Sequence, residues 1–280
     1  MSKHYNTVYG AFYDAIKHIF MTEDNAHIIF NRQIAPGVMY MGIFSPEIAS
    51  EATPGQFVML RVTSDRDPLL RRPFSICRAL NDGSINIIYR IVGRGTDLMA
   101  QMVKGDRVSV LGPLGQGYRL PDENQTPILV AGGMGIAPLI FLAHAINNPG
   151  MIFMAGFSTA GEIIPIDSIC HSTFNIKLAT DDGTYGYHGV VTDLLENALN
   201  DRNNTIVYTC GPVGMLKETA LMAMKSGIDC QVSLESAMAC GLGACQGCVV
   251  PASQDTASTY FNVCKDGPVF SADLIDWKIL

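Results

Sequence analysis

The chain has 280 residues, 48% of them hydrophobic, which is enough to bury a sizeable core in two or three domains. Its 19 basic and 26 acidic residues give a net charge of −7, so we predict no nucleic-acid partner. The first residues lack the basic and apolar regions of a secretory signal, and we therefore expect a cytoplasmic protein with reduced cysteines. In that compartment the eight cysteines favour a metal site over a disulfide framework.

After an N-terminal extension, residues 1–25, the pattern of residues 26–122 predicts an antiparallel β-barrel. Short runs rich in β-branched and aromatic residues alternate with Gly and Pro. The predicted strands cover residues 27–34, 37–44, 56–63, 84–91 and 106–112.

Residues 123–232 predict an open parallel α/β domain, because strand patterns there alternate with helical spacing of apolar residues. The sequence "PDENQTP" at 121–127 is the expected boundary between the two domains. The predicted strands cover 126–133, 151–158, 174–182 and 205–212, and the predicted helices 136–146, 190–199 and 213–227.

One long stretch, residues 124–161, contains no Asp, Glu, Lys or Arg and is longer than the roughly 20 residues of a membrane-spanning helix. Its middle carries Gly132, Gly133, Gly135 and Pro138, which indicate a turn between a strand and a helix. Such residues are tolerated in spanning helices, but a buried parallel sheet explains uncharged strands equally well. We predict strand, turn, helix and strand, with no membrane span.

Residues 233–280 predict a third, small domain that is organised by what its cysteines bind. The loop "CGLGACQGC" at 240–248 places three cysteines at C-x4-C-x2-C spacing, and Cys264 follows after fifteen residues. Four thiolates at this spacing are typical of plant-type [2Fe-2S] sites. A zinc knot is the alternative, but zinc sites usually combine two C-x2-C pairs and this chain has one. The predicted cluster ligands are Cys240, Cys245, Cys248 and Cys264.

Two further motifs suit phosphate groups. In "RRPFS" at 71–75 the arginines could form a solvated edge, but together with "YRIVGRGT" at 89–96 they pair a guanidinium with a glycine turn, and both attract anions. The turn "GGMGIAP" at 132–138 opens a helix whose N-terminus suits a pyrophosphate, although tight strand-to-helix packing would explain it too. A one-electron cluster beside a hydride donor needs a converter, and flavin is the usual one.

Taken in order, "DPLLRRPFSI", "YRIVGRGT", "GGMGIAPL", "TDDGTYGYHG", "CGP", "ESAMACGLGACQGC" and "CKDGPVF" resemble the ferredoxin-reductase family. Within it they look like the electron-transfer subunits of NAD-dependent dihydroorotate dehydrogenases. The resemblance implies an α+β multidomain fold with a flavin-binding barrel, a parallel α/β nucleotide domain and a C-terminal [2Fe-2S] domain. It covers roughly residues 30–270.

The resemblance also implies site residues. Arg72 would hold the FAD pyrophosphate, Ser75 would approach flavin N5, and Gly95 and Thr96 would bind phosphate oxygens. Phe74 stands where the family often has tyrosine. Ser75 and Cys210 would be catalytic, while Cys77, Cys170 and Cys230 are interpreted as buried apolar residues. The implied cofactor-binding residues are Arg72, Pro73, Phe74, Ser75, Tyr89, Arg90, Ile91, Gly95 and Thr96 for FAD, and Gly132, Gly133, Gly135, Pro138, Cys210, Gly211 and Pro212 for NAD(H).

The implied function is electron transfer from an FMN-containing TIM-barrel partner subunit, through [2Fe-2S] and FAD, to NAD in pyrimidine biosynthesis, within a heterotetramer. Glu162, with no basic cluster nearby, favours NAD over NADP. Two alternatives stay open. One is an FAD/[2Fe-2S] diaphorase subunit of another NAD(P)-linked complex, such as a ferredoxin-NADP transhydrogenase or a hydrogenase, and the other is a non-catalytic redox sensor.

Overall fold

A computed structural model describes residues 22–63, 65–166, 169, 174–199 and 204–280. Most of the predicted N-terminal extension lies outside these residues, as does Cys170. Strand β1 already begins at Thr22, within the range assigned to that extension.

The N-terminal part of the described chain is a closed antiparallel barrel, as predicted. Its strands follow the order β1-β2-β5-β4-β3-β6, and β6 pairs back with β1. Closure leaves no free strand edge, and the inward side chains of Ile28, Met41 and Ile87 are fully buried. The strands are β1 Thr22–Ala35, β2 Val38–Phe44, β3 Phe57–Arg61, β4 Arg72–Ala79, β5 Ser84–Arg90 and β6 Arg107–Leu114, with helices α2 Pro46–Glu51 and α3 Arg94–Gln101.

The middle of the chain forms a seven-stranded sheet in the order β10-β9-β8-β7-β11-β12-β15, parallel except for β15. Its central strand β11 is buried along its whole length and β7 is buried after Thr126, which explains their uncharged sequences. The elements are β7 Thr126–Gly132, η1 Gly133–Gly135, α4 Ile136–Ile146, β8 Ile152–Phe157, η2 Ala160–Glu162, β9 Ile176–Thr180, β10 Tyr187–His188, α6 Val191–Leu199, β11 Thr205–Cys210, α7 Val213–Lys225 and β12 Asp229–Ser233.

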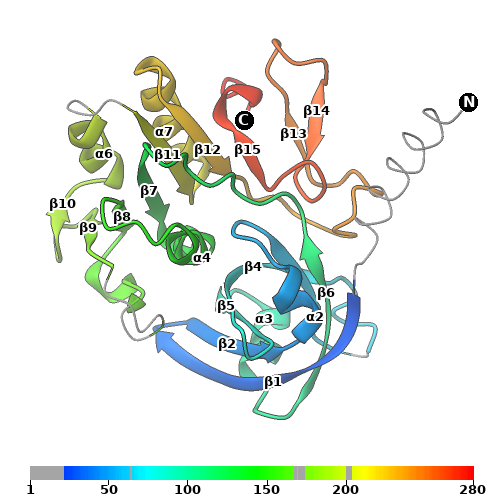
Figure 1. The fold of residues 1–280 in the computed structure, drawn as a ribbon. Helices are drawn as coiled ribbons and strands as arrows, with labels where there is room; N and C mark the ends of the chain where they lie inside the picture. The colour runs from blue at the N-terminus through cyan, green and yellow to red at the C-terminus, as the bar shows by residue number, and fades with distance from the viewer. Residues whose placement is uncertain (1–21, 64, 167–168, 170–173, 200–203) are drawn as a thin grey trace, which may run out of the picture.

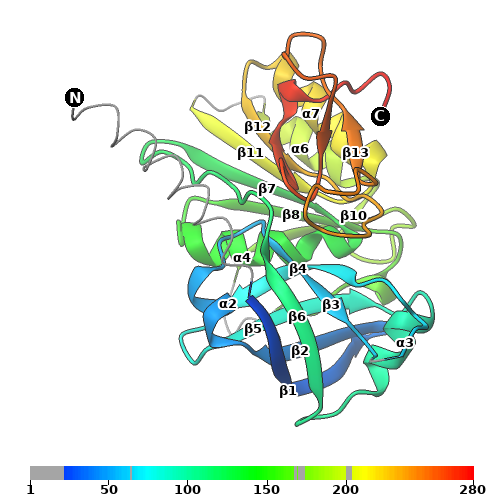
Figure 2. The same cartoon turned by 90° about the vertical axis from the view of Figure 1, so that its right-hand side faces the viewer.

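Helix α4 packs between the sheet and the barrel, whereas α6 and α7 cover the other face of the sheet (Figures 1 and 2). The long uncharged stretch is thus divided among β7, the 11-residue α4 and β8, as predicted. Within the described part of the chain, no helix is long and apolar enough to cross a membrane.

The C-terminal segment shares its core with the sheet. It contains β13 Val249–Pro251, β14 Tyr260–Asn262, β15 Val269–Ser271 and η3 Ala272–Leu274. β15 pairs with β12 at the sheet edge, and Cys248 and Trp277 pack into the same apolar cluster as Leu216 of α7. The position of the cysteine loop is therefore set by tertiary packing as well as by its ligand chemistry.

Candidate functional site

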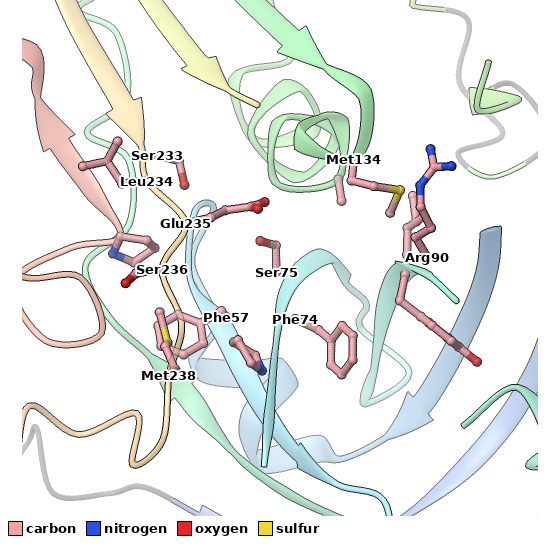
Figure 3. A pocket seen from close by; sticks show the side chains of 15 residues that line it. Phe57, Phe74, Ser75, Arg90, Met134, Ser233, Leu234, Glu235, Ser236 and Met238 are labelled. Carbon is pink, nitrogen blue, oxygen red and sulfur yellow. The ribbon is translucent and has the colours of Figure 1, made fainter. Parts of the chain in front are cut away.

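A pocket of about 220 Å³ lies where the barrel meets the start of α4 and the segment that follows β12 (Figure 3). Such a concave, mostly apolar space with a few polar groups is typical of a cofactor site. The lining residues are Phe57, Pro73, Phe74, Ser75, Ile88, Tyr89, Arg90, Met134, Ala137, Ser233, Leu234, Glu235, Ser236, Met238 and Pro268.

Five of the predicted FAD residues line this pocket: Pro73, Phe74 and Ser75 on β4, and Tyr89 and Arg90 on β5. The rings of Phe74 and Tyr89 meet edge to face at 5.7 Å. Tyr89 donates a hydrogen bond to Asn31 Oδ1 at 3.1 Å, and burial raises its pKa to about 12, so it stays a neutral phenol. An aromatic wall with neutral polar groups fits a planar ring such as that of a flavin.

Arg72 lies just outside the pocket, against the first turn of α3. A Cβ at Gly95 would come within 2.3 Å of Arg72 Nε, so only glycine lets the guanidinium lie this close. The hydroxyl of Thr96 accepts hydrogen bonds from the N–H groups of Val92 and Gly93, and therefore shapes the loop. A guanidinium beside a helix N-terminus suits a pyrophosphate.

The two predicted nicotinamide-nucleotide motifs come together at the carboxyl ends of the neighbouring parallel strands β7 and β11. A Cβ at Gly135 would lie 2.1 Å from the carbonyl oxygen of Cys210, and one at Gly132 would lie 2.6 Å from Pro212. Pro138 sits in the first turn of α4. The edge at which ligands of parallel sheets bind thus carries all seven predicted NAD(H) residues, although none of them lines the pocket. Of the predicted FAD residues, Arg72, Ile91, Gly95 and Thr96 also lie outside the pocket lining.

Glu235, the first residue of "ESAMACGLGACQGC", was not among the predicted site residues, yet it enters the pocket from the wall opposite Ser75 (Figure 3). It is accessible through the pocket, yet the protein around it desolvates the carboxylate and raises its pKa. Cys210 is 1% exposed, and burial together with the nearby Glu235 charge raises its pKa, so it remains a thiol. The position of Glu235 just beyond the carboxyl end of β12, next to β11, is the signal that could have revealed it.

The raised pKa of Glu235 predicts a pH-dependent stability. The folded state holds this proton more tightly than the unfolded state, whose pKa is near 4.5. The contribution of this proton to the free energy of unfolding is therefore fully present below pH 4.5, and it is lost as the pH rises through the pKa that Glu235 has in the folded state. Glu235→Gln has no such loss, so its melting temperature relative to wild type should increase from pH 4.5 upward. Thermal unfolding between pH 4 and 9 measures this difference, and a constant difference would contradict the prediction.

The four predicted cluster ligands form two pairs in one loop region. Cys248 Sγ lies 3.2 Å from Cys264 Sγ, and the N–H of Gly243 donates to Cys264 Sγ at 3.0 Å. The N–H groups of Leu242 and Cys245 donate to Cys240 Sγ at 3.3 and 3.4 Å. Burial opposes the effect of these bonds, but they lower the pKa of the Cys240 thiol from 9.0 to about 7.

This donor set fits a binuclear cluster. Across the described ranges, no three His, Cys, Asp or Glu side chains are arranged to hold a single metal ion. A [2Fe-2S] cluster needs two thiolates for each iron, which two neighbouring pairs supply, and backbone N–H groups directed at sulfur stabilise its negative charge. Cys248 and Cys264 are each 2% exposed, whereas Cys245 is exposed. The pair Cys248–Cys264 is therefore the inner one and the pair Cys240–Cys245 the outer one. Cys77 on β4 and Cys230 on β12 are buried, as predicted.

A closed barrel joined to a parallel α/β sheet, with a pocket between them and a four-cysteine segment beside it, defines a ferredoxin-reductase-like fold with an added iron–sulfur domain. Residues 235–276 match the family model of the iron-sulfur cluster binding domain of dihydroorotate dehydrogenase B, a range that contains all four predicted ligands.

Comparisons over the whole chain agree with this family-model match. The electron transfer subunit of dihydroorotate dehydrogenase B (NAD(+)) from Desulforamulus reducens is 35% identical over 257 residues, 91% of this chain and 98% of the relative. The corresponding subunit from Geobacillus thermodenitrificans is 40% identical over 252 residues, 88% and 95% of the two chains. A chain in the solved structure of NADH-dependent reduced ferredoxin-NADP oxidoreductase is 30% identical, with a TM-score of 0.80 over 92% of each chain. The protein belongs to the family of dihydroorotate dehydrogenase B electron transfer subunits.

Proposed function

We propose that this chain passes electrons from an FMN-containing, TIM-barrel dihydroorotate dehydrogenase subunit to NAD⁺, in a cytoplasmic heterotetramer of pyrimidine biosynthesis. When bound, FAD would exchange hydride with the nicotinamide and the [2Fe-2S] cluster would carry single electrons. The observation that carries the proposal is the continuity of the site. Met238 lines the pocket and Cys240 follows two residues later, so at most about 7 Å of chain separates the two Cα atoms.

Each of the three proposed domains would hold a different cofactor. In the barrel, residues 26–122, Phe74 and Ser75 would hold the flavin ring and Arg72 its pyrophosphate. In the α/β domain, residues 123–232, the turns at 132–135 and 210–212 would place the nicotinamide against the flavin. In residues 233–280 the four cysteines would hold the cluster, and their hydrogen-bonded loop would tune its potential.

The Ser75 and Glu235 side chains would control protons at the pocket. Because desolvation raises the pKa of its carboxyl, Glu235 holds its proton more readily than an exposed carboxylate does and is suited to proton exchange at the pocket. Cys210, kept as a thiol by its burial, would pack below the nicotinamide as a neutral group. Single electrons from the partner would enter through the adjoining cysteine loop and would leave as hydride to the nicotinamide.

The test is reconstitution. The isolated full chain should oxidise NADH with an artificial acceptor and leave dihydroorotate unchanged, because the carbon chemistry resides in the partner. Adding the FMN-bearing partner should restore dihydroorotate-dependent NAD⁺ reduction, followed by NADH absorbance. Turnover of dihydroorotate by the isolated chain would refute the division of labour, and failure of NADH to bleach the bound flavin would favour a redox sensor.

The similarity to NADH-dependent reduced ferredoxin-NADP oxidoreductase favours a second candidate, a diaphorase subunit of that type of complex. The two candidates share every cofactor motif and differ in the partner surface. Co-purification from native extract separates them, because the first predicts an FMN-bearing dihydroorotate dehydrogenase subunit and the second a different flavoprotein.

A further inference from the structure

An ion pair connects the two halves of the protein at the edge of the pocket. Arg90, at the end of β5 in the barrel, lies with its guanidinium 4.0 Å from the carboxylate of Glu162 in η2. Figure 3 shows the Arg90 side chain beside Met134, which belongs to the glycine turn η1. The pair therefore lies between the proposed flavin side and the proposed nicotinamide side.

Arg90 is the one basic side chain among the described residues that line the pocket. Although Arg90 is among the predicted FAD residues, its side chain lies beside Met134 of the predicted nicotinamide turn (Figure 3). A dinucleotide that approaches this turn carries two phosphate charges, and a guanidinium binds such groups with paired, charge-assisted hydrogen bonds. The 4.0 Å separation from Glu162 exceeds hydrogen-bond length, so the carboxylate attracts Arg90 without using its donors.

Glu162 is held in place although the pair itself is weak. The N–H of Ala160 donates to Thr184 Oγ1 at 2.8 Å, and the N–H of Glu162 donates to the carbonyl of Thr159 at 3.1 Å. The Arg90 and Glu162 side chains are 35% and 42% exposed, so solvent screens their attraction and an incoming anion can reach both.

We propose that Glu162 is a counter-ion that competes with the dinucleotide phosphates for Arg90, and so lowers the affinity of the site for NAD(H). This inference rests on the proposed function. It differs from the sequence-based expectation that Glu162, with no basic cluster nearby, favours NAD over NADP. A counter-ion affects NADH and NADPH equally, because both carry the same pyrophosphate, whereas a ribose contact distinguishes them.

The experiment uses the full chain purified with FAD. The rate of anaerobic flavin bleaching is measured at increasing concentrations of NADH or NADPH, and its concentration dependence gives the dissociation constant of each nucleotide. Glu162→Gln should tighten both by about two- to fivefold, the range of an exposed ion pair, and should leave the limiting bleaching rate unchanged. Arg90→Gln should weaken both by about tenfold or more, because it removes a charged hydrogen-bond donor. In the double variant, Glu162→Gln should have no further effect.

Asp229→Asn is the matched control, because it breaks the exposed Arg119–Asp229 pair, 3.2 Å apart and outside the pocket lining, and should change neither constant. Weaker NADH binding in Glu162→Gln, tighter binding of NADPH alone, or an effect that persists without Arg90 would overturn the inference. FAD content is measured for each variant. If NADH failed to bleach wild-type flavin, the proposed function itself would fail, whereas unchanged constants with normal bleaching would refute only the counter-ion.

Discussion

Cys248→Ser is expected to abolish NAD⁺ reduction by dihydroorotate in the complex while NADH oxidation with an artificial acceptor continues. Cys248 Sγ lies 3.2 Å from Cys264 Sγ inside the protein, so its loss removes one thiolate from the inner pair. The pocket for hydride transfer is lined by other residues and should remain intact. The wild type should contain about two iron and two sulfide per chain, and the variant neither.

Cys230→Ser is the control for this experiment. It makes the same chemical change at another buried cysteine, on β12 and away from the cysteine loop. It should keep its iron, its sulfide and its coupled activity. A Cys248→Ser protein that remained fully coupled would show that electrons bypass the cluster, and one equivalent of zinc without sulfide in the wild type would refute the cluster itself.

Gly135→Ala is expected to lower the rate of flavin reduction by NADH by about 100-fold, the effect of misplacing a reacting group by about 1 Å. The added methyl group would lie 2.1 Å from the carbonyl oxygen of Cys210, so the two turns must separate. The same overpacking should cost about 1–3 kcal/mol of folding stability. FAD should be retained, because Arg72 and the wall residues of β4 and β5 are elsewhere. Stopped-flow bleaching and thermal unfolding measure the two effects.

Gly214→Ala provides the comparison, because a Cβ there meets nothing within 4 Å and alanine favours the helix α7. It should keep wild-type NADH kinetics and equal or greater stability. The assignment of this turn to the nicotinamide nucleotide would be contradicted if Gly135→Ala lost FAD while the flavoprotein that remained showed wild-type NADH kinetics.

Local patterns predicted most of the secondary structure. Helix α4 occupies the range that its apolar spacing indicates, 136–146, and the uncharged strands on either side of it lie in the centre of the sheet. Short-range signals worked because side-chain periodicity and glycine turns act over a few residues. Three strands of the seven-stranded sheet, β10, β12 and β15, were missed, because each has at most five residues and is stabilised by pairing with a neighbouring strand.

The same division applies to the site. The spacing of the four cysteines, the arginine before β4 and the glycine turns are contained in short motifs, so the candidate cofactors followed from the chain alone. Glu235 and Met238 lie in the motif "ESAMACGLGACQGC", which assigned no role to them, and they become pocket residues only because β12 lies beside β11 and directs the chain toward the barrel.

By itself, the sequence determined the chemistry that the protein can support, because ligand type and spacing are local properties: four thiolates, a guanidinium before a strand and two glycine turns. Only the tertiary structure decided which of these groups meet. The cysteine loop packs against Met59 and Leu114 of the barrel through Gly241, and its inner cysteines share a core with α7. Arg90 and Glu162, 72 residues apart in the chain, face one another across the pocket edge. Such contacts depend on how the barrel and sheet pack, and no short stretch of sequence contains that information.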